Sequence, residues 1–200
     1  MRSEKALTRT QQARRHDIVA AAITVLTGEG FASASIERIA REAGASKGTV
    51  LYHFKTKEAV HEAVVELLYA NGAAYMTARI MAETTYRDRL RTYLSSNLRF
   101  IAENAAHVLA VQRILQNTTA AIAVPSGVDP LRDLLAAGQK SDEFGAFDPE
   151  VMSLAIRAVV DGAAHYFPVH PDLDVDHIIA EAQQIFEKAT AADPSREQKP

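Results

Sequence analysis

IERIAREAGASKGTVLYHF, residues 36–54, is the stretch that decides the fold of this 200-residue chain. Ser35 is the expected N-cap of a helix over residues 36–43, because a serine hydroxyl can accept a hydrogen bond from a free amide of the first turn. Gly44 ends that helix, and Ser46 caps a second short helix that runs to about His53. Two short helices joined at a glycine predict a helix-turn-helix, the shape that presents one helix to the major groove of DNA.

The apolar residues around this stretch predict a three-helix unit. Apolar side chains recur at helical spacing between residues 12 and 27, and Gly28 and Gly30 end that first helix. Val50 and Phe54 are four residues apart, so both should pack back on the first two helices. The side chains between them point outward and form the candidate reading surface.

The outward residues carry chemistry that suits DNA. Gly48 has no side chain, so the start of its helix can come close to phosphate or base edges. Lys47 can bond guanine or phosphate, Thr49 can use its hydroxyl or its methyl group, and Tyr52 offers a hydroxyl on a rigid ring. His53 and Lys57 lie where the next helix begins, and its free amides favour an anion. On the pattern alone, a three-helix unit with a solvated polar face remains the alternative.

Residues 14–60 resemble the DNA-binding domain of the TetR family of bacterial transcriptional repressors. The resemblance rests on Gly30-Phe31, Ile36, Ile39-Ala40, Gly44 to Thr49, Tyr52-His53-Phe54 and Lys57-Glu58. It implies that Ser46, Lys47, Thr49 and Tyr52 approach bases or backbone and that His53 and Lys57 hold phosphates. Many family members have an aromatic residue at the position of Leu51, which cannot donate a hydrogen bond and can instead touch a thymine methyl. The full set of expected DNA-binding residues is Ser35, Ser46, Lys47, Gly48, Thr49, Leu51, Tyr52, His53 and Lys57.

Composition and charge agree with a DNA-binding front end on a helical body. Residues 1–60 hold ten Lys and Arg against six Asp and Glu, whereas residues 61–200 hold twelve against nineteen. A basic N-terminal segment followed by an acidic remainder suggests that only residues 1–60 contact a polyanion. A chance fluctuation in composition could give the same difference in charge. The chain contains no cysteine, which excludes disulfides and favours an intracellular, cytoplasmic protein. Neither a signal peptide nor a membrane span is expected.

The rest of the chain predicts an all-α protein with two domains. Residues 1–55 form a basic arm and the helix-turn-helix domain, with the arm expected to lack structure until about Gln11. Residues 56–200 form a larger helical domain for ligand binding and dimerisation. It starts with a helix capped by Thr56 that runs toward Ile80, and later helices follow a polar break at residues 83–86 and the loops at residues 125–127 and 138–148.

Two apolar stripes near the C-terminus suggest a homodimer through residues about 150–190, as the resemblance also implies. One stripe is rich in small residues, which allow helices to approach closely: Leu154, Ala155, Ala158, Val159, Gly162 and Tyr166. The other stripe consists of Ile178, Ile179, Ala182, Ile185 and Phe186. Both stripes could instead face the core of a single subunit. A helix-turn-helix needs two half-sites about 34 Å apart, which favours the dimer.

The resemblance also implies a cavity in the larger helical domain for a small effector, which controls the spacing of the two DNA-binding domains in the dimer. Polar or aromatic residues that interrupt inward stripes are the candidates: Tyr93, Asn97, Phe100, Gln112, Gln116 and His165. A pocket of this kind would take an apolar or amphipathic effector. Each residue taken alone also fits an ordinary core or surface position.

Enzymatic motifs are absent from the sequence. There is no His-Glu-x-x-His, no Gly-x-Ser-x-Gly and no phosphate-binding glycine loop. Asp161 and His165 are four apart and can pair on one helical face, which is usually structural. The acidic run at residues 170–177 lacks the glycine and glutamate of a calcium loop, so we expect it to cap the last helix. No cofactor or metal is expected.

The sequence therefore predicts a homodimeric regulator that binds a palindromic DNA operator and is released by a small molecule. Repression is the default of the family rather than an inference from the residues. Two alternatives stay open: a DNA-binding regulator without a small-molecule effector, and a helical interaction module that no longer binds DNA.

Overall fold

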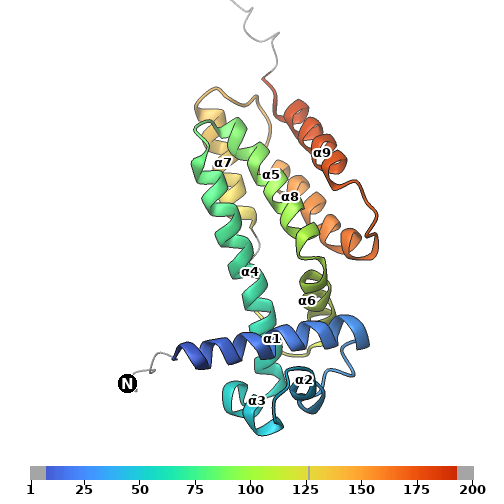
Figure 1. The fold of residues 1–200 in the computed structure, drawn as a ribbon. Helices are drawn as coiled ribbons and strands as arrows, with labels where there is room; N and C mark the ends of the chain where they lie inside the picture. Colours follow the sequence, from blue (N-terminus) through green and yellow to red (C-terminus); the bar gives the residue numbers. More distant parts are fainter. Residues whose placement is uncertain (1–7, 126, 193–200) are drawn as a thin grey trace, which may run out of the picture. The chain divides into compact units, whose positions relative to one another are not determined.

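The structure is a computed structural model that describes residues 8–125 and 127–192, and over this range it contains helices and no strand. The all-α prediction is therefore confirmed. The helices, labelled in Figure 1, follow in this order: α1 (Arg9–Glu29), α2 (Ile36–Glu42), α3 (Lys47–Phe54), α4 (Lys57–Ala82), α5 (Tyr86–Glu103), α6 (Ala105–Asn117), α7 (Val128–Lys140), α8 (Pro149–Tyr166), the 3-10 turn η1 (Phe167–Val169) and α9 (Val175–Thr190).

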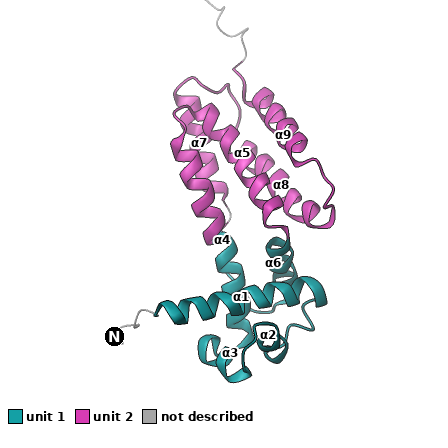
Figure 2. Ribbon diagram, viewed as in Figure 1, with its two compact units in different colours: residues 1–69, 106–123 teal, residues 70–105, 124–200 magenta. Residues whose placement is uncertain are grey.

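The chain divides into two compact units, coloured separately in Figure 2. Unit 1 consists of residues 1–69 and 106–123, and unit 2 consists of residues 70–105 and 124–200. The boundary expected after residue 55 lies inside unit 1, because the first part of α4 and nearly all of α6 join the helix-turn-helix. Helix α4 contributes its first half to unit 1 and its second half to unit 2.

Unit 1 is built on α1, which packs against both α2 and α3. Its core comprises Ile18, Ala22, Val25 and Leu26 of α1, with Ile39 of α2 and Val50 of α3. Helix α6 is tied to this unit by hydrogen bonds. Arg113 donates to the carbonyls of Leu26 and Thr27, at 2.9 Å for Thr27, and so satisfies acceptors at the end of α1.

Helix α1 begins earlier than the sequence pattern suggested. The Thr8 hydroxyl accepts from the amide of Gln11, and the Gln11 side chain accepts from the amide of Thr8. This reciprocal capping box satisfies two free donors and starts the helix at Arg9. The expectation that the arm lacks structure until Gln11 is therefore wrong for residues 8–11, and residues 1–7 lie outside the described range.

Unit 2 is a group of helices around α5, which contacts α7, α8 and α9. The core cluster combines residues from all four helices and from the loop after α7: Leu90, Leu94, Leu131, Leu135, Phe144, Ile156 and Phe186. Asp148 and Asp174 cap α8 and α9 by accepting from first-turn amides. The acidic run before α9 thus acts as a cap, as expected. None of the described helices is long and apolar enough to cross a membrane.

The polar break expected at residues 83–86 is shorter than predicted, since α5 already begins at Tyr86. Thr85 is the reason: its hydroxyl accepts from the amide of Asp88 at 3.0 Å and lies 2.6 Å from the Asp88 carboxylate. The acidic Asp88 in the first turn also complements the helix dipole.

Candidate nucleic-acid interface

Helix α3 has one buried and one exposed face, as the sequence predicted. Val50 is fully buried and Phe54 nearly so. Lys47, Gly48 and Tyr52 are exposed on the other side. Because the apolar pair fixes the helix against α1 and α2, its exposed side chains project from a rigid support.

Serine caps fix the starts of both short helices. Ser35 accepts from the amide of Arg38 at 3.2 Å, and Ser46 accepts from the amide of Thr49 at 3.1 Å. The Ser46 hydroxyl also lies 2.9 Å from the Thr49 hydroxyl. Both serines therefore act as caps, and Thr49 adds a methyl group and a hydroxyl with capacity for a further partner.

Gly48 has open space around its Cα. A Cβ built there would meet only the Ser46 hydroxyl, at 3.7 Å. Its backbone angles are those of an ordinary helix, since Gly48 is not among the residues with a positive φ. Neither backbone geometry nor crowding within the chain requires glycine at this position, which leaves close approach by another molecule as its physical use.

The far end of α3 is held by α1. The Arg15 guanidinium donates to the carbonyl of His53 at 2.5 Å and lies over the Phe54 ring at 4.1 Å. Gln11 donates to the Tyr52 hydroxyl at 3.3 Å. Burial, followed by the charge of Arg15, lowers the pKa of His53 below its ordinary value. Both effects favour the neutral imidazole of His53, which can offer a hydrogen bond.

Lys57 and Phe31 form a cation–π contact at the start of α4, with the ammonium 4.7 Å from the ring centroid. The ring of His61 packs against the same Phe31 ring at 5.1 Å. Thr56 caps the helix by accepting from the amide of Ala59 at 3.1 Å. The Lys57 ammonium thus remains able to bind an anion and lies beside the free first-turn amides of α4. This arrangement suits a phosphate.

The structure gathers the predicted DNA-binding residues in unit 1, on α3, on the two serine caps and at the start of α4. Leu51 and His53 are half-buried rather than fully exposed. Three residues that the sequence analysis did not select join this region: Arg15, Gln11 and Glu37. Arg15 donates to the His53 carbonyl. Gln11 contacts Tyr52, and the Glu37 carboxylate accepts a hydrogen bond from the Lys47 ammonium. The basic character of the arm was a signal for Arg15, whereas no local signal pointed to Gln11 or Glu37.

The predicted ligand-binding residues are dispersed. Gln112 and Gln116 lie on α6 in unit 1, and the other four lie in unit 2. The Asn97 amide is buried and donates to the Tyr93 carbonyl at 2.8 Å, one turn earlier on α5. His165 is exposed and its Nδ1 lies 2.8 Å from the Asp161 carbonyl, so the expected pairing with the Asp161 carboxylate does not form.

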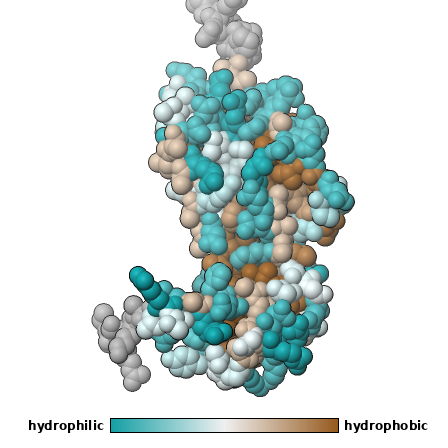
Figure 3. Space-filling view, in the orientation of Figure 1, coloured by the Kyte–Doolittle hydropathy of each residue, from teal (hydrophilic) through white to brown (hydrophobic). Residues whose placement is uncertain are grey.

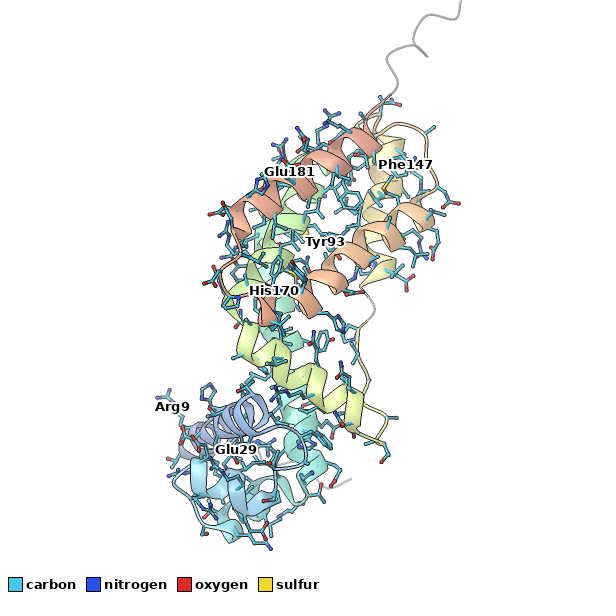
Figure 4. The ribbon with its side chains drawn as sticks, turned by 90° about the vertical axis from the view of Figure 1, so that its right-hand side faces the viewer. Arg9, Glu29, Tyr93, Phe147, His170 and Glu181 are labelled. Carbon is cyan, nitrogen blue, oxygen red and sulfur yellow. The ribbon has the colours of Figure 1, made fainter. Side chains whose placement is uncertain are left out.

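Tyr93 and Phe100 occupy the interior side of α5. Arg157 of α8 donates to the Tyr93 hydroxyl at 3.2 Å, and Figure 4 places Tyr93 among the helices of unit 2. Phe100 packs against Tyr75 of α4 with ring centroids 5.6 Å apart, and its ring covers Gly72. These contacts make an aromatic and polar surface between α4, α5 and α8.

An open groove of about 380 Å³ lies beside this surface in unit 2. Its walls come from α4, from α5 and from the turn between them: Tyr75, Arg79, Ala82, Glu83, Thr92, Ser95, Ser96 and Arg99. The Arg79 guanidinium stacks on the Tyr75 ring at 3.4 Å, and Arg99 pairs with Asp176. More of the groove's lining surface is apolar than polar, and none of the six predicted ligand-binding residues lines it. Among the described residues, no cluster of His, Asp and Glu could hold a metal ion.

One prediction concerns His61, which is buried and whose Nε2 has no hydrogen-bond partner among the described residues. Burial, reinforced by the charge of Lys57, lowers the pKa of His61 from its ordinary value of 6.5 to about 4. The unfolded chain therefore takes up this proton first, and folding stability should fall as the pH drops from 6.5 toward 4. The full shift corresponds to about 3 kcal/mol, which solvent screening reduces to about 2 kcal/mol.

Urea denaturation followed by circular dichroism at pH 7 and pH 4.5 measures this loss. His61→Leu removes the proton site, so its stability should depend less on pH than that of the wild type by about the same amount. His53 and His107, whose pKa values are also lowered mainly by burial, contribute equally to both proteins and cancel in the difference. Identical pH dependence in the two proteins would contradict the assignment.

The comparisons with known proteins agree with this geometry. Residues 18–64 match the sequence profile described as bacterial regulatory proteins of the tetR family. The chain is 31% identical over 98 residues to the HTH-type transcriptional regulator BetI of Pectobacterium carotovorum subsp. carotovorum (strain PC1), a match covering 48% of this chain and 50% of the relative. The chain thus matches about half the length of that curated relative.

Solved structures are similar over nearly the whole chain. A bacterial regulatory protein in the tetR family from Rhodococcus RHA1 superposes with a TM-score of 0.76 at 24% identity, covering 90% of this chain and 98% of the other. The regulator AibR, solved in complex with isovaleryl coenzyme A and operator DNA, gives a TM-score of 0.71 at 16% identity, covering 86% and 97%. At these identities the likeness shows a shared fold.

Proposed function

This chain belongs to the TetR family of bacterial transcriptional regulators, and we propose that it represses transcription by binding a palindromic operator as a homodimer that a small molecule releases. The observation that carries the proposal is the two-sided helix α3. Val50 and Phe54 anchor it, while Lys47, Gly48 and Tyr52 remain exposed. A supported helix with an uncrowded glycine near its start can enter a major groove.

The proposed DNA-binding role of each residue follows from the contacts of its side chain. Lys47, Thr49 and Tyr52 lie on the exposed face of α3 and are the proposed base-reading residues, with Leu51 for a thymine methyl. Lys57, together with the free amides of α4, is the proposed phosphate contact, and His53 at the end of α3 is a second one. Ser35 and Ser46 support this surface through their capping bonds.

The dimer is proposed through α8. The stripe rich in small residues that the sequence singled out, Leu154 to Tyr166, is exposed in the single chain, so it does not belong to the core of one subunit. Leu154 is 52% exposed and Tyr166 is 50% exposed. Figure 3 shows hydrophobic atoms over the α8 and α9 side of unit 2. A continuous exposed apolar face of this kind marks an interface, and a second copy is the occupant that a palindromic operator requires.

Helix α9 makes a smaller contribution to this proposed interface. Ile179, Ala182 and Phe186 of its stripe are buried against unit 2, and Ile178 is half-buried. Ile185 is the one member of the stripe that is more than half exposed. The alternative noted for both stripes, a place in the monomer core, thus fits most of α9 but does not fit α8.

The proposed effector site lies in unit 2, between the second half of α4 and α5. Of the predicted residues, Phe100 contacts Tyr75 at the edge of the groove, whereas Tyr93 contacts Arg157 of α8 and Asn97 donates to the Tyr93 carbonyl. The Tyr75 ring beside Arg79 suits an amphipathic molecule with an anionic end, whereas Arg99 is already paired with Asp176. Helix α4 carries both Tyr75 and Lys57, so one helix connects the effector site to the proposed phosphate contact.

Selection of bound duplexes from a random library, followed by fluorescence anisotropy, tests the DNA-binding proposal. A preferred palindromic sequence is expected. Lys57→Ala should weaken binding to every duplex, whereas Tyr52→Phe and Thr49→Ala should change which duplexes are preferred. Binding that is equal for all duplexes at moderate salt would overturn the proposal in favour of a helical interaction module. Unchanged preference in both α3 variants would mean that other residues read the bases.

A further inference from the structure

The lysine at the start of the reading helix is held by a carboxylate from the neighbouring helix. Lys47 is the first residue of α3, and its ammonium donates to Oε1 of Glu37 in the first turn of α2. Both side chains are more than half exposed, at 57% and 55%. The hydrogen bond from Lys47 is the main reason that the pKa of Glu37 lies below its ordinary value. A negative charge therefore stands beside the proposed base-reading lysine.

This ion pair contributes little to the stability of the fold. Exposed pairs between long side chains contribute little to stability, because solvent screens them and both chains lose rotamer freedom. Ser35 and Ser46 already cap the two helices that carry Glu37 and Lys47. A carboxylate next to a DNA-binding surface also opposes binding to a polyanion. Its placement is better explained by what it does to Lys47.

The other two lysines near the interface have different partners. Lys57 lies over the ring of Phe31, and Lys55 lies over the ring of Tyr52 at 5.4 Å while donating to the Tyr52 carbonyl. Neither forms an ion pair with any described residue. An aromatic partner leaves the ammonium charge uncompensated and available to a phosphate, whereas a carboxylate partner compensates it.

We propose that Glu37 is a specificity-determining residue that withholds Lys47 from phosphates and directs it to a base edge. The inference rests on the proposed operator binding. An ammonium has three N–H donors, so Lys47 can keep Glu37 and still donate to the neutral O6 or N7 of guanine. A phosphate at the same place brings its negative charge close to the Glu37 carboxylate, which costs free energy. Glu37 thus weakens binding to random duplexes more than binding to the operator.

Glu37→Gln, Lys47→Gln and the double variant form a cycle that tests this coupling, with the salt dependence of binding measured on the selected operator and on a random duplex. Glu37→Gln should tighten random-duplex binding about three- to tenfold at low salt. The plot of log affinity against log salt concentration should become steeper by about one released counterion per protomer. The preference for the operator should fall by a similar factor. In the Lys47→Gln background the same change should leave the slope unaltered.

Glu66→Gln is the matched control, because Glu66 is an exposed residue of α4 in the same unit. If Glu37→Gln and Glu66→Gln change operator and random binding alike, Glu37 acts only as a general charge and the proposal is overturned. A wild type without operator preference would refute the proposed function instead. The random-duplex slope of Glu37→Gln would then still decide whether Glu37 withholds Lys47 from phosphates. Melting temperatures that match the wild type would exclude a structural effect.

Discussion

Replacing Leu154 by Glu is expected to convert the proposed dimer to monomers at micromolar concentration. Leu154 is one of the exposed large apolar residues of α8, together with Val151, Val159 and Tyr166. Burying a carboxylate in an apolar contact without a partner costs several kcal/mol, enough to weaken the dimer more than a hundredfold. Operator affinity should fall by about 10²- to 10⁴-fold, because the two helix-turn-helix domains are then no longer linked and each must bind its half-site alone.

Sedimentation equilibrium and anisotropy on the operator measure the two effects. Met81→Glu is the matched control: Met81 is 66% exposed on α4, outside the α8 face, so this variant should remain a dimer and keep its affinity. Circular dichroism should show unchanged helix content in both variants, since neither position contributes to the core of its unit. If Leu154→Glu remains a dimer, the two copies associate through another surface.

The start and end signals of the helices were predictable because they are local. Ser35, Ser46 and Thr56 each cap a helix through a residue three positions ahead, and these short-range bonds follow from residue type and spacing alone. The burial of Val50 and Phe54 follows in the same way from a four-residue period. Local rules therefore sufficed for the helix-turn-helix and for the face of α3 that points outward.

Other features depend on partners far away in the sequence. Glu37 and Lys47 belong to different helices, and their contact requires the angle between α2 and α3, which no periodicity supplies. Arg113 of α6 joins unit 1 through carbonyls at the end of α1, so the domain division could not be read from a boundary in the chain. The dispersed ligand-binding residues have the same cause, because each was selected by its place on a stripe and not by its neighbours in space.

The two apolar stripes show what helical periodicity can predict and what it cannot. Each stripe identifies one face of a helix, but periodicity does not say whether that face meets the same chain or another one. The structure separates them: the stripe of α8 is exposed, and most of the stripe of α9 is buried. Ala155, Ala158 and Gly162 lie on the exposed stripe, and such small residues suit the close approach of a second helix that the proposed dimer requires.

Gly48→Ala is expected to weaken operator binding about ten- to a hundredfold without destabilising the protein. A Cβ at this position would meet only the Ser46 hydroxyl, at an ordinary van der Waals distance of 3.7 Å. Alanine is also a better helix former than glycine by up to about 1 kcal/mol, so the melting temperature should stay the same or rise. The loss of affinity corresponds to about 1.4 to 2.8 kcal/mol and would come from a methyl group between the helix and the DNA.

Gly28→Ala supplies the comparison, because Gly28 also has open space around its Cα but lies in the last turn of α1, away from α3 in sequence and without a proposed DNA contact. It should keep full affinity. Gly48→Leu should weaken binding further, since a larger side chain keeps the helix farther from the groove. If Gly48→Ala bound the operator as tightly as the wild type, the start of α3 would not approach the DNA closely. The contacts proposed for Lys47 and Thr49 would then have to reach across a wider gap, which the three methylene groups beyond the Lys47 Cβ allow and the short Thr49 side chain does not.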